Sequence, residues 1–176
     1  MLWSPVAVRS ALFALHGIDL ELASIVAGTT EPMIGEIRLA WWREALIGLD
    51  AGTVPAQPLL QLIAAELLPR GVGGAELAAL EDRWLPMIGA VDVPSAHVAG
   101  GATLFGLAAQ LLGGDRALGE RLGAAWARAD ATDLPQVSSV LGPLLGLVRL
   151  AARDAADPPG SLGRQWLLLK TIAFAR

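Results

Sequence analysis

The sequence predicts an all-α protein, and three observations support this class. Apolar residues recur at helical spacing along almost the whole chain, alanine and leucine dominate, and neither β-branched runs nor hairpin signals occur. The 176 residues are enough for one hydrophobic core. We therefore predict a single-domain helical bundle of about eight helices that spans residues 1–176.

Turn and capping signals set the bounds of these helices. Residues 28–32 offer a threonine cap and a proline in the first helical turn, and the glycines of 71–74 end a helix. Asp133 is interpreted as an N-cap ahead of Pro135, and residues 157–161 force a turn before the last helix. The predicted helices span 5–27, 31–49, 57–69, 74–90, 94–112, 115–130, 135–155 and 161–175.

The composition excludes several classes of protein. A net charge of −4 without basic runs gives no footprint for nucleic acid, and the absence of cysteine excludes disulfides, thiolate catalysis and zinc–sulfur sites. The apolar share of 54% is high for a soluble domain, so part of the apolar surface is expected to face a partner or a membrane. Residues 93–114 carry no charge, but their polar residues and glycines favour a buried central helix over a membrane span. The N-terminus lacks the features of a signal peptide, so we predict a cytoplasmic protein, with peripheral membrane contact as an option.

Asp19 and Arg38 form the candidate charged pair. On a helical wheel Arg38 lies near the centre of a broad apolar arc, between Ile34 and Trp41. Asp19 lies within the apolar face of the preceding helix. Because an unpaired buried charge is very costly and consecutive helices usually pack antiparallel, we predict a buried Asp19–Arg38 ion pair. The pair is either structural or leaves Arg38 to hold an anionic group.

His16 and His97 are the only histidines. They lie on different predicted helices without other metal ligands at a suitable spacing, and a zinc site normally needs three or four ligands. We interpret both as ordinary, partly buried or surface histidines.

Residues 31–46 contain the string Arg-Leu-Ala-Trp-Trp at 38–42, which resembles the Arg-Leu-x-Trp-Trp helix of squalene/phytoene synthase-like proteins. Residues 9–15 are similar to the segment that precedes this helix in the family, and weaker echoes follow at 80–83, 101–108 and 122–126. The resemblance implies a shortened form of the all-α isoprenoid synthase bundle with a central cavity. It makes Asp19, Arg38, Trp41 and Trp42 the hypothetical ligand-binding residues.

The acidic motifs that the family's chemistry requires are incomplete. Mg²⁺ prefers oxygen ligands, and two Asp-x-x-x-Asp motifs place such carboxylates on facing helices in the family. Near the expected first motif stand only Asp19 and Glu21, which project to opposite sides of a helix, and near the second stand Asp130 and Asp133. The resemblance therefore favours the non-catalytic branch that includes complex I assembly factor-like proteins, with no catalytic residue, metal or other cofactor.

Two hypotheses about function follow. The first is a non-catalytic protein that binds a prenyl or lipid-like molecule, a protein partner or a second copy of itself, and no nucleic acid. The alternative is a Mg²⁺-dependent prenyltransferase that acts on isoprenyl diphosphates. In that alternative Asp19, Asp130 and Asp133 bind the metal and Arg38 binds the diphosphate.

Overall fold

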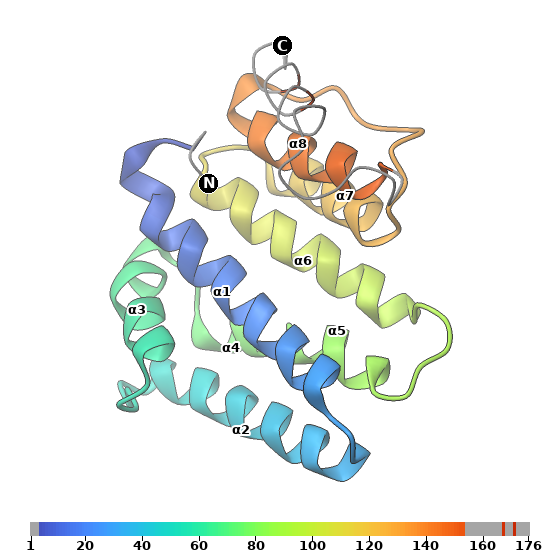
Figure 1. Ribbon diagram of the computed structural model, residues 1–176. Helices are drawn as coiled ribbons and strands as arrows, with labels where there is room; N and C mark the ends of the chain where they lie inside the picture. The colour runs from blue at the N-terminus through green and yellow to red at the C-terminus, as the bar shows by residue number, and fades with distance from the viewer. Residues whose placement is uncertain (1–3, 154–166, 168–170, 172–176) are drawn as a thin grey trace. The chain divides into compact units, whose positions relative to one another are not determined.

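A computed structural model describes residues 4–153, 167 and 171, and this part of the chain is helical, with no strand (Figure 1). The prediction of an all-α protein is confirmed. The α-helices are α1 (Val6–Gly28), α2 (Pro32–Asp50), α3 (Pro58–Glu66), α4 (Gly74–Ala78), α5 (Glu81–Trp84), α6 (Ser95–Leu111), α7 (Arg116–Ala127) and α8 (Gly142–Ala151). Single 3₁₀ turns are η1 (Leu68–Arg70), η2 (Leu85–Met87) and η3 (Ser139–Leu141).

The chain divides into two compact units. The first comprises residues 9–100, and the second comprises residues 1–8 together with 101–176. In the first unit α2 packs mainly against α4, and also against α3 and α5. In the second unit α7 packs against α8.

The first unit is built around the buried faces of α1 and α2, which diverge from the turn that joins them (Figure 1). Both faces follow the three- and four-residue spacing of a helix. On α1 the buried apolar residues include Leu12, Leu15, Ile18, Leu22 and Ile25; on α2 the buried residues are Gly35, Leu39, Trp42, Leu46 and Leu49.

The contact between α2 and α4 depends on Gly74 and Asp50. A side chain at position 74 would collide with the carbonyl oxygen of Leu46, so only glycine allows this approach. The Asp50 carboxylate accepts hydrogen bonds from the backbone N–H groups of Gly74 and Ala75, at 2.6 and 2.8 Å. These two bonds satisfy donors that the start of α4 leaves free. Asp50 thus ties the end of α2 to the start of α4.

The second unit shows an equally close helix approach. Gly119 and Gly123 of α7 face the backbone of α6 at Phe105 and Gly101, where a Cβ atom would collide. The ring of Phe105 stacks on Trp126 with centroids 5.0 Å apart. Small residues at the crossing let the two backbones approach, and the aromatic pair fills the space beside it.

Two of the predicted helix ranges and one predicted cap were wrong. The predicted helix 74–90 is divided into α4, α5 and η2, and Pro86 lies in η2, since a proline cannot donate the backbone bond that a helix needs. The predicted helix 135–155 begins only at η3, and α8 starts at Gly142, so Asp133 caps no helix. The threonine cap at 28–32 is absent as well: Glu31 is the N-cap without a side-chain bond, although Pro32 does occupy the first turn. Apart from residues 167 and 171, the predicted helix 161–175 lies outside the described residues.

Within the described residues, α1 is long and apolar enough to cross a membrane by length and composition alone. A core helix of a soluble protein passes the same test, and one face of α1 is buried. The helix is therefore compatible with a soluble or a peripheral protein, and it fixes no location.

Candidate functional site

Asp19 is buried in the middle of α1, with 5% of its surface exposed. Its Oδ1 atom accepts a hydrogen bond of 2.8 Å from the indole Nε1 of Trp84. The guanidinium Nη1 of Arg83, itself buried, lies 3.3 Å from the same oxygen. Burial raises the pKa of Asp19, although the charge of Arg83 and the bond from Trp84 act in the opposite direction.

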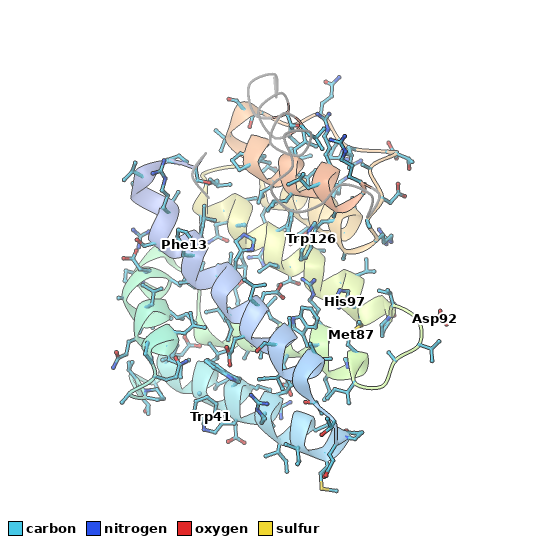
Figure 2. All side chains as sticks on the ribbon, viewed as in Figure 1. Phe13, Trp41, Met87, Asp92, His97 and Trp126 are labelled. Atoms are coloured by element: carbon cyan, nitrogen blue, oxygen red, sulfur yellow. The ribbon has the colours of Figure 1, made fainter. Side chains whose placement is uncertain are left out.

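His97, in the first turn of α6, completes this group (Figure 2). Its Nε2 atom lies 3.3 Å from Nη2 of Arg83, and its Nδ1 atom lies 3.4 Å from the Arg83 carbonyl oxygen. A guanidinium only donates and a carbonyl only accepts, so both contacts require the neutral imidazole with its proton on Nδ1. Burial lowers the pKa of His97, and the charge of Arg83 lowers it further.

Trp84 packs against both His97 and Arg83. Its ring meets His97 edge to face with centroids 4.9 Å apart, and the Arg83 Cζ atom lies 4.8 Å from the ring centre. Asp19, Arg83, Trp84 and His97 are named the Asp19 cluster below. Gly100 allows α6 to approach Arg83 closely, because a Cβ atom at this position would collide with the side chain of Arg83.

Asp19 does not pair with Arg38, so the predicted ion pair was wrong. Arg38 is exposed, while Leu39 and Trp42 on the same helix are buried. The apolar arc on the helical wheel is wide enough to contain two apolar stripes. Because α2 packs against α4 at Leu46, only the stripe that contains Leu46 faces the core. Arg38 lies on the other, outward side of α2, where its charge stays in water.

The outward side of α2 carries an apolar stripe of its own. Met33, Ile34, Ile37 and Trp41 are 71%, 52%, 63% and 48% exposed, and we name them the outer stripe. Figure 2 shows Trp41 on the side of α2 that faces away from α1. Trp41 meets the buried Trp42 edge to face at 5.2 Å. The two tryptophans of the Arg-Leu-x-Trp-Trp string therefore differ: one belongs to the core and the other to the surface.

Asp130 and Asp133 lie in the second unit, beside a shallow hollow of about 300 Å³. Both are exposed and lie outside any helix, so they do not share the helix face that the metal hypothesis needs. Oδ1 of Asp130 accepts hydrogen bonds from the hydroxyl and the backbone N–H of Thr132, at 2.7 and 2.9 Å, and these bonds lower its pKa. Arg121 and Arg128 line the same hollow, and their positive charges oppose the binding of a divalent cation.

Among the residues with described positions, no three histidine, aspartate or glutamate side chains form a group that could hold a metal ion. Asp19 belongs to no such group, and its carboxylate forms an internal ion pair with Arg83.

Sequence reasoning missed the partners of Asp19. Arg83 follows Leu77 and Leu80 at steps of three, and both leucines are buried, so this spacing could have shown that Arg83 faces the core. His97 lies in the uncharged stretch 93–114, where a buried polar residue needs a partner. Nothing in the sequence indicated that these residues meet Asp19, because the contacts join three separate helices.

The fold and the cluster define an all-α protein with a buried ion pair on its first helix, and the comparison with family models adds the family. The model of the squalene/phytoene synthase family matches residues 1–71 of the 176, which cover α1, α2 and α3. Residues 1–71 are therefore similar to squalene/phytoene synthases, and the match supports membership of that family. The helical architecture is consistent with the isoprenoid synthase-like fold. No curated protein and no solved structure matches the chain.

Proposed function

We propose that this squalene/phytoene synthase-like protein is non-catalytic and acts by binding another protein chain through the outer stripe of α2. The observation that carries the non-catalytic part of the proposal is the burial and internal pairing of Asp19. This residue lies nearest to the position expected for the family's first metal motif. Its carboxylate is buried and already held by Arg83 and Trp84.

A metal role for Asp19 would require this internal pair to break. Mg²⁺ needs several oxygen ligands and retains bound waters, whereas Asp19 is almost fully enclosed. Removing Asp19 from Arg83 would leave a buried guanidinium without its carboxylate, which costs several kcal/mol. The chemistry of the site thus favours a structural carboxylate over a metal ligand.

The form of the apolar surface favours a protein partner over a prenyl ligand. The outer stripe lies along the exposed side of a helix, and tryptophan, methionine and arginine are enriched at protein interfaces. Arg38, also exposed, adds a hydrogen-bond donor on this side of α2. Glu36 and Glu44 are exposed on the same helix, and with the net charge of −4 they disfavour an anionic membrane surface. The simplest partner is a second copy of the chain.

The non-catalytic part is tested by thermal unfolding with farnesyl diphosphate, with and without Mg²⁺. We expect no metal-dependent rise in Tm for the wild-type protein. A Mg²⁺-dependent rise that disappears in Asp19→Asn but persists in Asp92→Asn, an exposed loop control, would instead establish the prenyltransferase alternative.

The binding part is tested by sedimentation equilibrium of the wild-type protein and of an Ile34→Gln/Ile37→Gln/Trp41→Gln variant. We expect concentration-dependent self-association that the triple variant weakens at least about tenfold, while a Glu36→Gln/Glu44→Gln control retains it. A monomeric wild-type protein that floats with zwitterionic lipid vesicles through the same three side chains would favour a lipid surface and contradict the proposal.

A further inference from the structure

We infer that the Asp19 cluster is an acid-sensitive latch: neutral His97 holds the first turn of α6 to α5, and protonation of His97 releases it. This inference concerns regulation of the fold, and it does not depend on which partner or ligand the protein binds.

The geometry permits only one protonation state of His97. Its Nε2 lone pair accepts from Arg83 Nη2 at 3.3 Å, while Nδ1–H faces the Arg83 carbonyl oxygen at 3.4 Å. A proton added to Nε2 would replace the accepted bond with two N–H groups that point at each other. It would also place a second positive charge beside the guanidinium in a water-poor interior, where such repulsion is strong.

The charged groups around His97 offer little compensation for an added proton. Asp19 of α1 and Arg83 of α5 act on His97, and the charge of Arg83 also acts on His16 of α1. Asp19 is the single carboxylate of the cluster, and its Oδ1 atom already contacts Arg83 and the Trp84 indole. Glu81, also on α5, is held by Arg43 of α2 at 3.1 Å.

The direction of the pH effect follows from these surroundings. The pKa of His97 lies below its ordinary 6.5 in the folded protein, because of burial and of Arg83. The unfolded chain therefore takes up a proton first, so the stability contributed by neutral His97 is present above about pH 6.5 and is lost as the pH falls. His16 acts in the same direction, since burial and nearby positive charge lower its pKa to about 4.

Asp19 acts in the opposite direction. Its pKa is raised in the folded protein, so its titration favours the folded state at the acid end and offsets part of the histidine effect there. Protonation of Asp19 also removes the negative charge that faces Arg83. The latch is therefore expected to weaken as the pH falls from about 6.5 through the lowered pKa of His97 in the folded protein.

Because of the packing around the cluster, protonation of His97 is expected to displace the first turn of α6. Gly100 lies directly against Arg83, and the His97 ring lies against Trp84. A displacement of His97 therefore moves residues 95–100 away from α5. It also changes the surroundings of the Trp84 indole.

The test uses the fact that the chain has only two histidines. In a His16→Gln variant the single imidazole is His97, and its pKa can be read from one NMR signal. We expect a value below 6.5, with increased amide exchange (corrected for the intrinsic pH dependence) at residues 95–100 as this signal titrates. A pKa at or above 6.5, or titration without such opening, overturns the latch. This measurement stands even if substitution of His97 prevents folding.

Thermal unfolding supplies the second readout. From about pH 7.5 to about pH 5, the Tm of His16→Gln should fall by roughly 3–6 °C more than that of His16→Gln/His97→Gln. Glutamine retains an acceptor for Arg83 but carries no titrating proton. Equal pH dependence in the two variants would overturn the inference.

Discussion

In the prenyltransferase alternative Asp19 and Asp130 would serve the same purpose, as metal-binding carboxylates, but the structure places them in opposite environments. Asp19 is buried and is held by side chains of α5, whereas Asp130 is exposed and bonds to Thr132 in its own turn. Burial raises the pKa of Asp19, and hydrogen bonds lower the pKa of Asp130. The comparison teaches that the chemistry of an aspartate depends on the side chains that enclose it, and not on its sequence spacing.

Arg83→Met should have the largest effect, because it leaves the buried Asp19 carboxylate without its cation. We expect the free energy of unfolding to fall by about 3–5 kcal/mol, measured by urea denaturation at neutral pH. Arg121→Met in the exposed hollow is the matched control, with an expected change within about 0.5 kcal/mol. Similar losses in the two variants would mean that Arg83 contributes no more than a surface charge.

Asp50→Ala tests a third kind of aspartate, which is exposed but binds two backbone N–H groups at the start of α4. We expect a loss of about 1–2 kcal/mol in urea denaturation, as for the removal of other helix caps. Asp92→Ala, in the exposed loop before α6, should change stability by less than about 0.5 kcal/mol. Equal free energies of unfolding for Asp50→Ala and Asp92→Ala would mean that the Asp50 cap contributes no stability.

Ala129→Gly should stabilise the protein by about 0.5–1 kcal/mol, because Ala129 ends α7 with a φ of 52°, a left-handed conformation that glycine adopts more easily. Thermal unfolding would show the rise in Tm. The control is Ala117→Gly inside α7, where the same change should destabilise by a similar amount. A loss of stability in both variants would argue against the left-handed turn beside Asp130.

Arg38→Met should have the smallest effect, within about 0.5 kcal/mol, since the Arg38 side chain is exposed. Urea denaturation of the Arg38→Met and Arg83→Met variants under the same conditions compares the contributions of the two arginines to stability. A loss of several kcal/mol at Arg38 would restore the original prediction of a buried pair with Asp19.

The helical class and the buried position of Asp19 could be predicted from the sequence, and both depend on local periodicity. The spacing of Leu12, Leu15, Ile18 and Leu22 defines one face of α1 without knowledge of the neighbouring helices. The resemblance to the family was also recognisable, because the Arg-Leu-x-Trp-Trp string is a local pattern, and the family model matches the region that contains it.

The partners of Asp19 could not be predicted, because they depend on how the helices are rotated. Trp41 and Trp42 are adjacent and equally apolar, yet only Trp42 is buried. A side chain at Gly74 would meet Leu46, and this contact between distant segments fixes the rotation of α2. The same rotation places Arg38 in water, and Arg83 of the short helix α5 pairs with Asp19 instead.

A double-mutant cycle between Asp19 and Arg83 tests the account most directly, because everything proposed about Asp19 depends on its pairing with that arginine. The free energy of unfolding would be measured for the wild-type protein, Asp19→Leu, Arg83→Met and the double variant. We expect the double variant to lose at least about 2 kcal/mol less than the sum of the single losses, since neither charge is then left alone in the core. Strictly additive losses would contradict the claim that Arg83 holds Asp19 as a structural carboxylate.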